Sequence, residues 1–239
     1  MTVAVIFALL LIANFARSGL PSVRSKSGAD WLLDVAGLTV QGTFVPVAQM
    51  TVVAVSIGVM YPGAIGSIHL PGWASFLLCF VGVDYAYYWN HRLLHSRLLW
   101  PAHVVHHTVT ELDVLGTSRN TLWSSALILY LWVNGAMICL LSDPTPYAIG
   151  VSASAALDLW RHSSLQPPAP LARVLGLALI LPDDHAWHHS DTELHANYGA
   201  NLRWWDQLHG TWYPSDAPPQ TLGVQTKLSL GRKLFWPFE

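Results

Sequence analysis

The chain has 239 residues, of which 52% are hydrophobic and only 11% are charged. A soluble domain carries about 25% charged residues, so this composition argues against a water-soluble protein and favours an integral membrane protein. The net charge of −2 and the lack of a basic cluster argue against a nucleic-acid partner, and two cysteines without a CxxC motif argue against a disulfide framework or a thiolate metal site.

Five apolar segments predict membrane spans, because a transmembrane helix needs about 20 mainly apolar residues. In chain order they cover residues 1–16, 43–62, 73–90, 122–142 and 147–162. We interpret residues 1–16 as a retained span, since they lack the basic start and clear cleavage site of a signal peptide, although removal of this segment stays an open alternative. Residues 17–30 are expected to form a polar loop, and residues 31–42 are too short and polar to span and are placed at the membrane interface.

The distribution of Lys and Arg predicts the orientation of these spans. With the N-terminus outside, the outer loops are residues 63–72 and 143–146, and neither contains a Lys or Arg. All twelve basic residues then lie on the inner side or at inner span ends, as the positive-inside rule requires. The same threading places eleven of the twelve histidines, all except His69, on the cytoplasmic side. We therefore expect an all-α fold, an integral membrane bundle of four or five transmembrane helices with a cytosolic helical cap.

Eight histidines fall into three blocks with helical spacing. The first block is H-x3-H and the other two are H-x2-H-H, and residues three or four apart lie on one face of an α-helix. Pro101 and Pro182 stand just before the second and third blocks, where proline suits the first turn of a helix. The blocks comprise His91 and His95, then His103, His106 and His107, then His185, His188 and His189. His162, at the inner end of the fifth span, is a ninth candidate ligand.

These blocks predict a dinuclear metal centre below the membrane. Neutral imidazole suits iron, zinc, copper and nickel, and eight imidazoles exceed the four to six positions around one ion but fit two ions with open positions. A metal-bound histidine usually donates its second N–H to a carboxylate or a carbonyl. The candidates for such supporting residues are Asp84, two helical turns before His91, together with Asp158, His195, Asn197 and Asp206.

Three segments resemble the sterol desaturase / fatty acid hydroxylase superfamily. They read DYAYYWNHRLLH, HVVHH and DDHAWHHSDTELHANYGANLRWWDQLHGTWY, follow the order of that family's motifs, and extend over about residues 80–215. The chain departs from the pattern at Thr108, where the family usually has Ser, and the N-terminal 70 residues match no known pattern. The resemblance implies a catalytic domain at residues 73–215, after an N-terminal transmembrane region at 1–72 and before a tail at 216–239.

The resemblance also implies a chemistry. The eight block histidines and His162 would hold two iron ions, for which zinc can substitute in a purified sample, and no residue beyond the metal site is expected to be catalytic. Such an enzyme uses O2 and external electrons to hydroxylate or desaturate a C–H bond of a fatty acyl, sterol or isoprenoid lipid. Because the chain has no haem, Fe–S or dinucleotide motif, a separate ferredoxin or cytochrome with its reductase is expected as the electron donor.

Two other functions are weighed against this one. A histidine-rich membrane metal transporter, or a metal-binding protein without redox chemistry, would need metal-binding residues along the spans themselves, and the second and fourth spans offer none. A zinc hydrolase is disfavoured because the H-E-x-x-H motif is absent and eight histidines exceed the three ligands that such a site needs.

Overall fold

The described part of the chain is built from helices. The computed structural model describes residues 2–215 and 217–238, so Met1 of the first expected span, Asp216 at the start of the expected tail and Glu239 lie outside the described residues. Within these ranges the structure has α, 3₁₀ and π helices joined by loops, and its only strand-like pairs are isolated bridges. The prediction of an all-α fold is confirmed.

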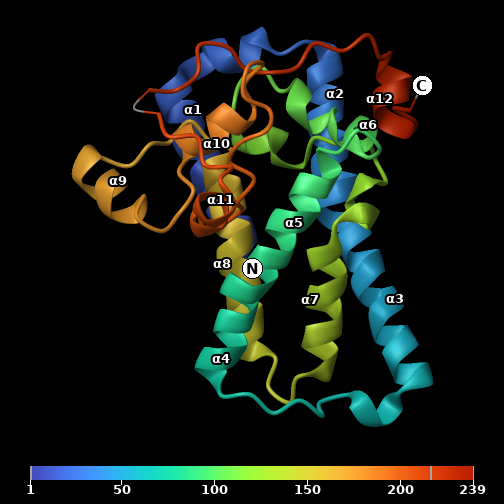
Figure 1. Cartoon of the computed structure of the whole chain (residues 1–239). Coiled ribbons are helices and arrows are strands. Elements are labelled where there is room, and N and C mark those ends of the chain that lie inside the picture. Colours follow the sequence, from blue (N-terminus) through green and yellow to red (C-terminus); the bar gives the residue numbers. More distant parts are fainter. Residues whose placement is uncertain (1, 216, 239) are drawn as a thin grey trace.

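A bundle of long helices carries a cap of short elements at one end (Figure 1). The bundle contains α3 (Val45–Met60), the continuous run of α4 (Gly72–Leu77), π helix η3 (Leu78–Val83) and α5 (Asp84–Leu94), then α7 (Leu129–Leu140) and α8 (Thr145–Arg161). Helix α3 packs on α7, and α8 packs on α4 and on α1 (Thr2–Ser25). At the end away from the cap, the loop after α3 pairs with the loop after α7, because Ser142 N donates to the carbonyl of Ile68.

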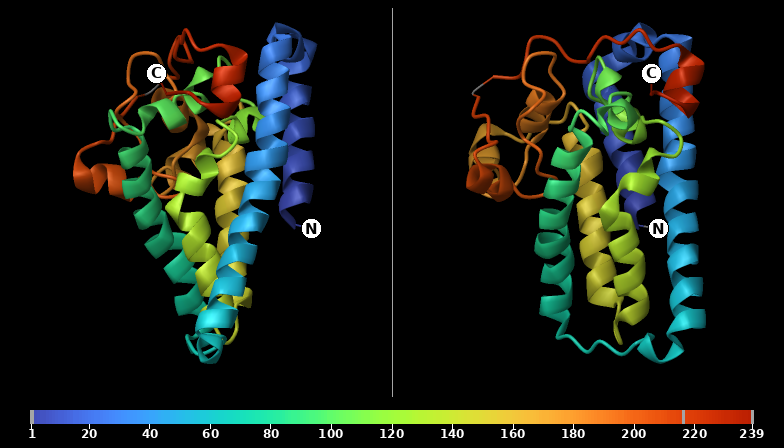
Figure 2. Two further views of the ribbon diagram at one scale, coloured as in Figure 1. Left: turned by 90° about the vertical axis from the view of Figure 1, so that its right-hand side faces the viewer. Right: turned by 45° about the vertical axis from the view of Figure 1, so that its right-hand side comes forward.

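The cap contains most of the shorter helical elements (Figure 2). They are α2 (Gly28–Ala36), α6 (Trp100–His103), the 3₁₀ turns η4 (His106–Thr108), η5 (Val114–Ser118) and η6 (Ser124–Leu127), and the helices α9 (Ala169–Leu175), α10 (Pro182–His188), α11 (Trp204–His209) and α12 (Leu230–Phe235). A further 3₁₀ turn, η2 (Pro62–Ala64), lies at the opposite end of the bundle.

The N-terminal third departs from the predicted segments. Residues 31–42 are not a separate interfacial piece, because α2, the π helix η1 (Gly37–Phe44) and α3 form one helical run from Gly28 to Met60. Two polar side chains that weakened the apolar pattern are buried against the cap: Asp34 pairs with Arg119, and Gln41 bonds to the backbone of Thr121. The predicted loop at 17–30 is likewise replaced in part by α1, which continues to Ser25.

The fourth expected span is shorter than its apolar sequence. Residues 124–127 form the 3₁₀ turn η6, and α7 begins only at Leu129. Side chains from neighbouring helices bind the backbone of this turn, since Gln41 accepts from Ser125 N while Asn90 accepts from Leu129 N and donates to the carbonyl of Leu127. These bonds replace the helical ones that the sequence would otherwise make.

The long N-terminal run carries the clearest membrane-crossing feature. Among the described residues, Gly28–Met60 is the one helix that is long and apolar enough to cross a membrane by length and composition, and Val3–Arg17 and Leu129–Leu140 are shorter apolar helices. Large apolar side chains of the run face outward, and Val59, for example, is 77% exposed.

Candidate metal centre

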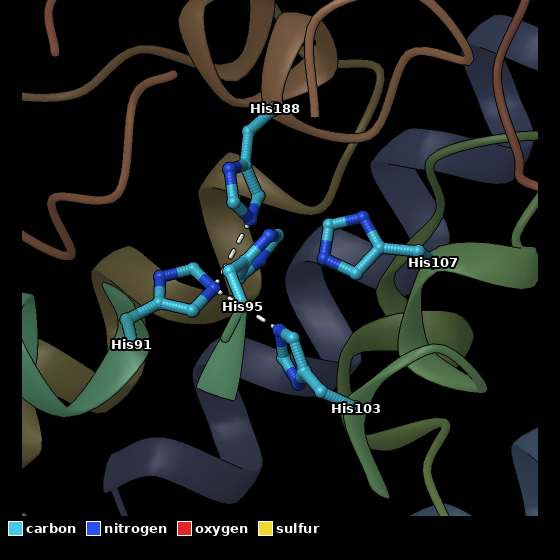
Figure 3. Close-up of side chains that lie close together, drawn as sticks. All are labelled: His91, His95, His103, His107 and His188. Atoms are coloured by element: carbon cyan, nitrogen blue, oxygen red, sulfur yellow. Dashed lines mark hydrogen bonds between the residues drawn. The ribbon is translucent and has the colours of Figure 1, made fainter. Parts of the chain in front are cut away.

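Nine histidines meet in the cap directly above the bundle and form two adjacent clusters. Within each cluster, one ligand nitrogen per residue lies within 4.8 Å of the others. The first cluster contains His91, His95, His103, His107 and His188, which point toward a common centre (Figure 3). The second cluster contains His106, His162, His185 and His189. The structure therefore brings together all eight block histidines and His162.

Short helices at the cap keep the first block in one cluster and divide the second and third blocks between the two clusters. His91 lies on α5 and His95 caps that helix, so the first block stays together. The second block does not form one regular helix as predicted: α6 ends at His103, and His106 begins the separate turn η4. His103 and His107 face the first cluster, whereas His106 faces the second.

The third block is helical as predicted and is also divided. Helix α10 begins at Pro182 and ends at His188, with His189 as its C-cap. His188 faces the first cluster, whereas His185 and His189 face the second. The two clusters consequently share walls, and the His107 and His189 rings stack with centroids 4.5 Å apart.

Backbone carbonyls fix the tautomers of two histidines in the first cluster. His91 Nδ1 lies 2.9 Å from the carbonyl oxygen of Tyr198, and His188 Nδ1 lies 2.7 Å from that of Ala196. A carbonyl can only accept, so each Nδ1 carries the proton and each neutral ring has a bare lone pair on Nε2. These two Nε2 atoms face each other at 3.0 Å, where no hydrogen can lie between them.

The second cluster repeats this arrangement. His106 Nδ1 donates to the carbonyl of Arg119 at 3.2 Å, and His162 Nδ1 donates to that of Asp158 at 2.8 Å. Their Nε2 atoms are therefore also unprotonated in the neutral rings, and they lie 3.3 Å apart. Each cluster thus holds a pair of opposed lone pairs that a cation would satisfy.

Burial opposes the protonation of three of these rings. It lowers the pKa of His103 and His188 to about 3, and it lowers the pKa of His106 well below its usual range. These three rings are accordingly neutral at physiological pH, which is the form that binds metal.

The donor set fits metal ions in both clusters. Two imidazole nitrogens bound at right angles to one ion at about 2.1 Å lie about 3 Å apart, which matches the opposed pairs. Both ring nitrogens of His95 and of His107 are buried without a hydrogen-bond partner, and buried polar atoms of this kind require an explanation such as an ion. The residues present therefore suit a nitrogen-rich centre for two transition-metal ions.

A backbone segment, residues 196–202, supports the first cluster. Its carbonyls at Ala196 and Tyr198 hold His188 and His91, and two buried carboxylates hold the segment itself. Asp206 accepts from Tyr198 N at 2.8 Å and from Gly199 N at 2.7 Å. Gly199 is required here because a Cβ would lie 2.7 Å from the carbonyl oxygen of Leu202.

Asp84 acts on the same segment from the bundle. Its carboxylate accepts from Asn201 N at 2.8 Å, from Leu202 N at 3.1 Å and from the Trp205 indole at 2.8 Å. The sequence places Asp84 beside a histidine as a direct acceptor, but in the structure it reaches the histidines through the backbone. Asp84 and Asp206 thus hold the 196–202 segment from two sides.

The other three predicted supporting residues have different positions. Asp158 Oδ1 lies 3.2 Å from His162 Nδ1, so this carboxylate directly approaches a cluster histidine. Asn197 adopts a left-handed conformation, with φ of 54°, and its side chain bonds to the backbone of Asp184 and Tyr213. His195 is exposed, and its ring centroid lies 6.2 Å from that of His95.

Some supporting groups escape sequence reasoning. The carbonyls of Ala196, Tyr198 and Arg119 leave no signature, since every residue has a carbonyl. The two carboxylates that pair with Arg119 could have been noticed in the sequence, because Asp30 and Asp34 are spaced i, i+4 in an otherwise apolar stretch. This spacing places them on one face of a helix.

A cavity of about 750 Å³ extends from the second cluster into the bundle. His103, His106 and His162 form part of its wall. Its apolar wall includes Phe7, Leu38, Val83, Leu131 and Val151. Ala4 of α1 and Thr39 of η1 also line the cavity and are exposed, so it reaches the protein surface between these two helices.

Comparison with known proteins agrees with this site. The sequence pattern of the fatty acid hydroxylase family matches residues 76–211, which include all nine cluster histidines. An ornithine lipid hydroxylase OlsE from Rhizobium tropici is 30% identical over 202 residues, covering 75% of this chain and 58% of that protein. Alkylglycerol monooxygenases from Danio rerio and Homo sapiens are 29% and 28% identical and cover 57% and 56% of this chain.

The matches span only part of each relative. The chain covers a little over half of the ornithine lipid hydroxylase and about 30% of each alkylglycerol monooxygenase. No solved structure matches the chain.

Proposed function

The chain belongs to the fatty acid hydroxylase family, and we propose that it is a membrane-bound di-iron oxygenase that hydroxylates or desaturates a C–H bond of a lipid-like substrate. It uses O2 as co-substrate and takes electrons from an external donor. The observation that carries this proposal is the pair of adjacent clusters formed by nine buried imidazoles.

One iron ion binds in each cluster. When bound, the two ions supply the oxidising chemistry needed to attack an unactivated C–H bond. The chain itself fixes the orientation of the ligand rings through the carbonyls at Tyr198, Ala196, Arg119 and Asp158. It also keeps the site dry, since each cluster histidine is at most 7% exposed.

The cavity is the substrate site. Its apolar walls suit a lipid chain, and its exposure between α1 and η1 gives a lateral route from a bilayer to His106 and His162. The names of the two kinds of relatives describe enzymes that act on an ornithine lipid and an alkylglycerol, which supports a lipid for this chain.

The membrane arrangement follows from the same reasoning. The apolar helices of the bundle form four or five spans, and the cap with its metal centre lies on the cytoplasmic side, where the Lys and Arg residues gather. Residues 73–215 form the catalytic domain, with residues 1–72 as an N-terminal transmembrane region. A ferredoxin or a cytochrome with its reductase supplies the electrons.

Lipid analysis tests this proposal. Cells that express the chain with a ferredoxin and its reductase are compared with cells that express the His106→Ala, His188→Ala double variant, and total lipids are examined by mass spectrometry. A lipid that gains one oxygen atom indicates hydroxylation, and one that loses two hydrogen atoms indicates desaturation. The comparison is repeated with a cytochrome and its reductase as the electron donor. If the chain binds metal stoichiometrically but no lipid differs between the two strains with either the ferredoxin or the cytochrome, the oxygenase proposal is wrong and metal binding alone is favoured.

A further inference from the structure

Arg119 connects the second cluster to the N-terminal part of the chain. Its backbone carbonyl accepts from His106 Nδ1, while its guanidinium points the other way and is buried, with the whole residue only 2% exposed. Nε donates to Asp34 at 2.6 Å and Nη1 donates to Asp30 at 2.9 Å. Both carboxylates lie on α2, so one residue joins this helix to a histidine of the metal centre.

Further charges surround this ion pair. Lys26 Nζ lies 2.6 Å from Asp34 Oδ2 and 2.5 Å from Asp113 Oδ2. The other oxygen of Asp113 accepts from Gly116 N and so caps the turn η5 that leads to Arg119. The five groups form a closed, mostly buried network in which each carboxylate has at least one cation. Breaking a buried pair of this kind leaves an uncompensated charge, so the network strongly favours one geometry.

Backbone packing brings the junction of α2 and η1 close to the peptide that precedes Arg119. Gly37, between the two helices, approaches the 118–119 segment so closely that a Cβ would lie 2.3 Å from the carbonyl oxygen of Ser118 and 3.1 Å from the Cα of Arg119. No residue other than glycine fits there without moving one of the two backbones. Arg119, whose carbonyl orients His106, is therefore held by ion pairs at its side chain and by packing against the peptide that precedes it.

We propose that Arg119 is a positioning residue, which uses its ion pairs with Asp30 and Asp34 to fix the carbonyl that orients His106. Helix α2 thereby sets the metal affinity of the second cluster. This inference rests on the proposed metal centre but not on its reaction with O2. It assigns a role to a segment that lies outside the family match at residues 76–211.

Among the described residues, the oriented histidines of the first cluster have no such link to the N-terminal segment, and the Arg119 guanidinium approaches that cluster only through a 3.4 Å bond to the carbonyl of Thr108, beside His107. These oriented histidines, His91 and His188, are held by the carbonyls of Tyr198 and Ala196, and that segment is held by Asp84 and Asp206. A change at Arg119 should accordingly affect one ion and leave the other unchanged, which separates positioning from a general loss of stability.

A double-mutant cycle tests the proposal without catalysis. Full-length metal-free protein, Arg119→Met, His106→Ala and the double variant are titrated with Zn²⁺ in competition with a chromophoric chelator. Arg119→Met should weaken one of two binding events by about 10-fold, the lower end of the effect of partners that orient metal ligands. In the His106→Ala background the same change should have no further effect, since the residue it acts through is gone.

Arg203→Met is the matched control. Arg203 is also partly buried, donates to the carbonyl of Gly176 and packs on Trp212, but it holds no carbonyl that receives a histidine. It should leave both affinities unchanged.

Unchanged Zn²⁺ affinity in Arg119→Met would overturn the proposal, and so would a loss that persists in the His106→Ala background or that Arg203→Met reproduces. If Arg119→Met does not fold, Asp34→Asn replaces it in the same cycle. Because Zn²⁺ binding needs neither O2 nor an electron donor, this result stands apart from the outcome of the lipid analysis.

Discussion

Replacing Asp84 with Asn should destabilise the protein through the 196–202 segment rather than through loss of a metal ligand. The carboxylate accepts three N–H groups, and the isosteric amide has only one oxygen. If that oxygen keeps Leu202 N and the Trp205 indole, the new NH2 group faces the N–H of Asn201 across the 2.8 Å that Oδ1 now occupies. One buried donor is then unpaired, and two hydrogen bonds lose their charge assistance.

The magnitude follows from these three bonds. An unpaired buried donor costs about 1–3 kcal/mol, and the difference between a charged and a neutral acceptor is about 1 kcal/mol for each remaining bond. Relief of the buried charge offsets part of this cost, so the expected loss in free energy of unfolding is about 3 kcal/mol. For a chain of this size, that corresponds to a fall in Tm of about 6–12 °C.

The assay is thermal unfolding in detergent, followed by the fluorescence of the twelve tryptophans, with iron content measured on the same samples. Asp143→Asn is the control, because Asp143 is exposed and, among the described residues, accepts only from Thr145 N. It should change Tm by less than about 2 °C, as surface substitutions usually do. Iron loss should accompany the Tm shift, since the segment holds His91 and His188. An Asp84→Asn protein with the Tm and iron content of the wild type would show that the three N–H bonds do not support the site.

Four other tests address the centre and its surroundings. His188→Ala and His106→Ala should each lower iron content by about one ion per chain, whereas full retention in either would contradict the assignment of one ion to each cluster. Removing metal with a chelator should lower Tm by several degrees, because ions bound to the folded state alone stabilise it, and readdition should restore it. Single cysteines at Ile65 and Thr145 should react with a membrane-impermeant thiol reagent only from the side opposite the histidines, and labelling of either from the histidine side would refute the proposed orientation. Gly199→Val should abolish iron binding at the first cluster, because its side chain would meet the carbonyl of Leu202, and unaltered iron content would show that the segment can move without consequence.

The histidines themselves could be predicted from the sequence because their chemistry is local. Spacings of three and four residues place imidazoles on one face of a helical turn, and the nine candidates do meet. How they divide between two clusters could not be predicted from spacing, since His106 and His188 hold the same place in their blocks but face different clusters. The cluster that each histidine faces depends on how its segment packs against other parts of the cap.

The N-terminal helices could not be predicted correctly, because their structure depends on contacts with distant residues. Asp34 and Gln41 interrupt the apolar pattern, so the sequence suggested two separate segments where the structure has one run. Both side chains are satisfied by residues about 80 positions away, Asp34 by Arg119 and Gln41 by Thr121 and Ser125. A polar side chain in a helical sequence does not reveal whether a residue far along the chain will bind it in the protein interior.

The histidine clusters, with their opposed lone pairs, form only late in the synthesis of the chain. The nascent chain cannot complete either cluster until His188 and His189 have emerged, and the carboxylate of Asp206 that anchors the 196–202 segment is synthesised later still. The metal ions of the proposed centre would consequently be delivered after most of the polypeptide has been translated. A cell starved of iron should accumulate newly made copies whose caps are loosely closed and open to proteolysis.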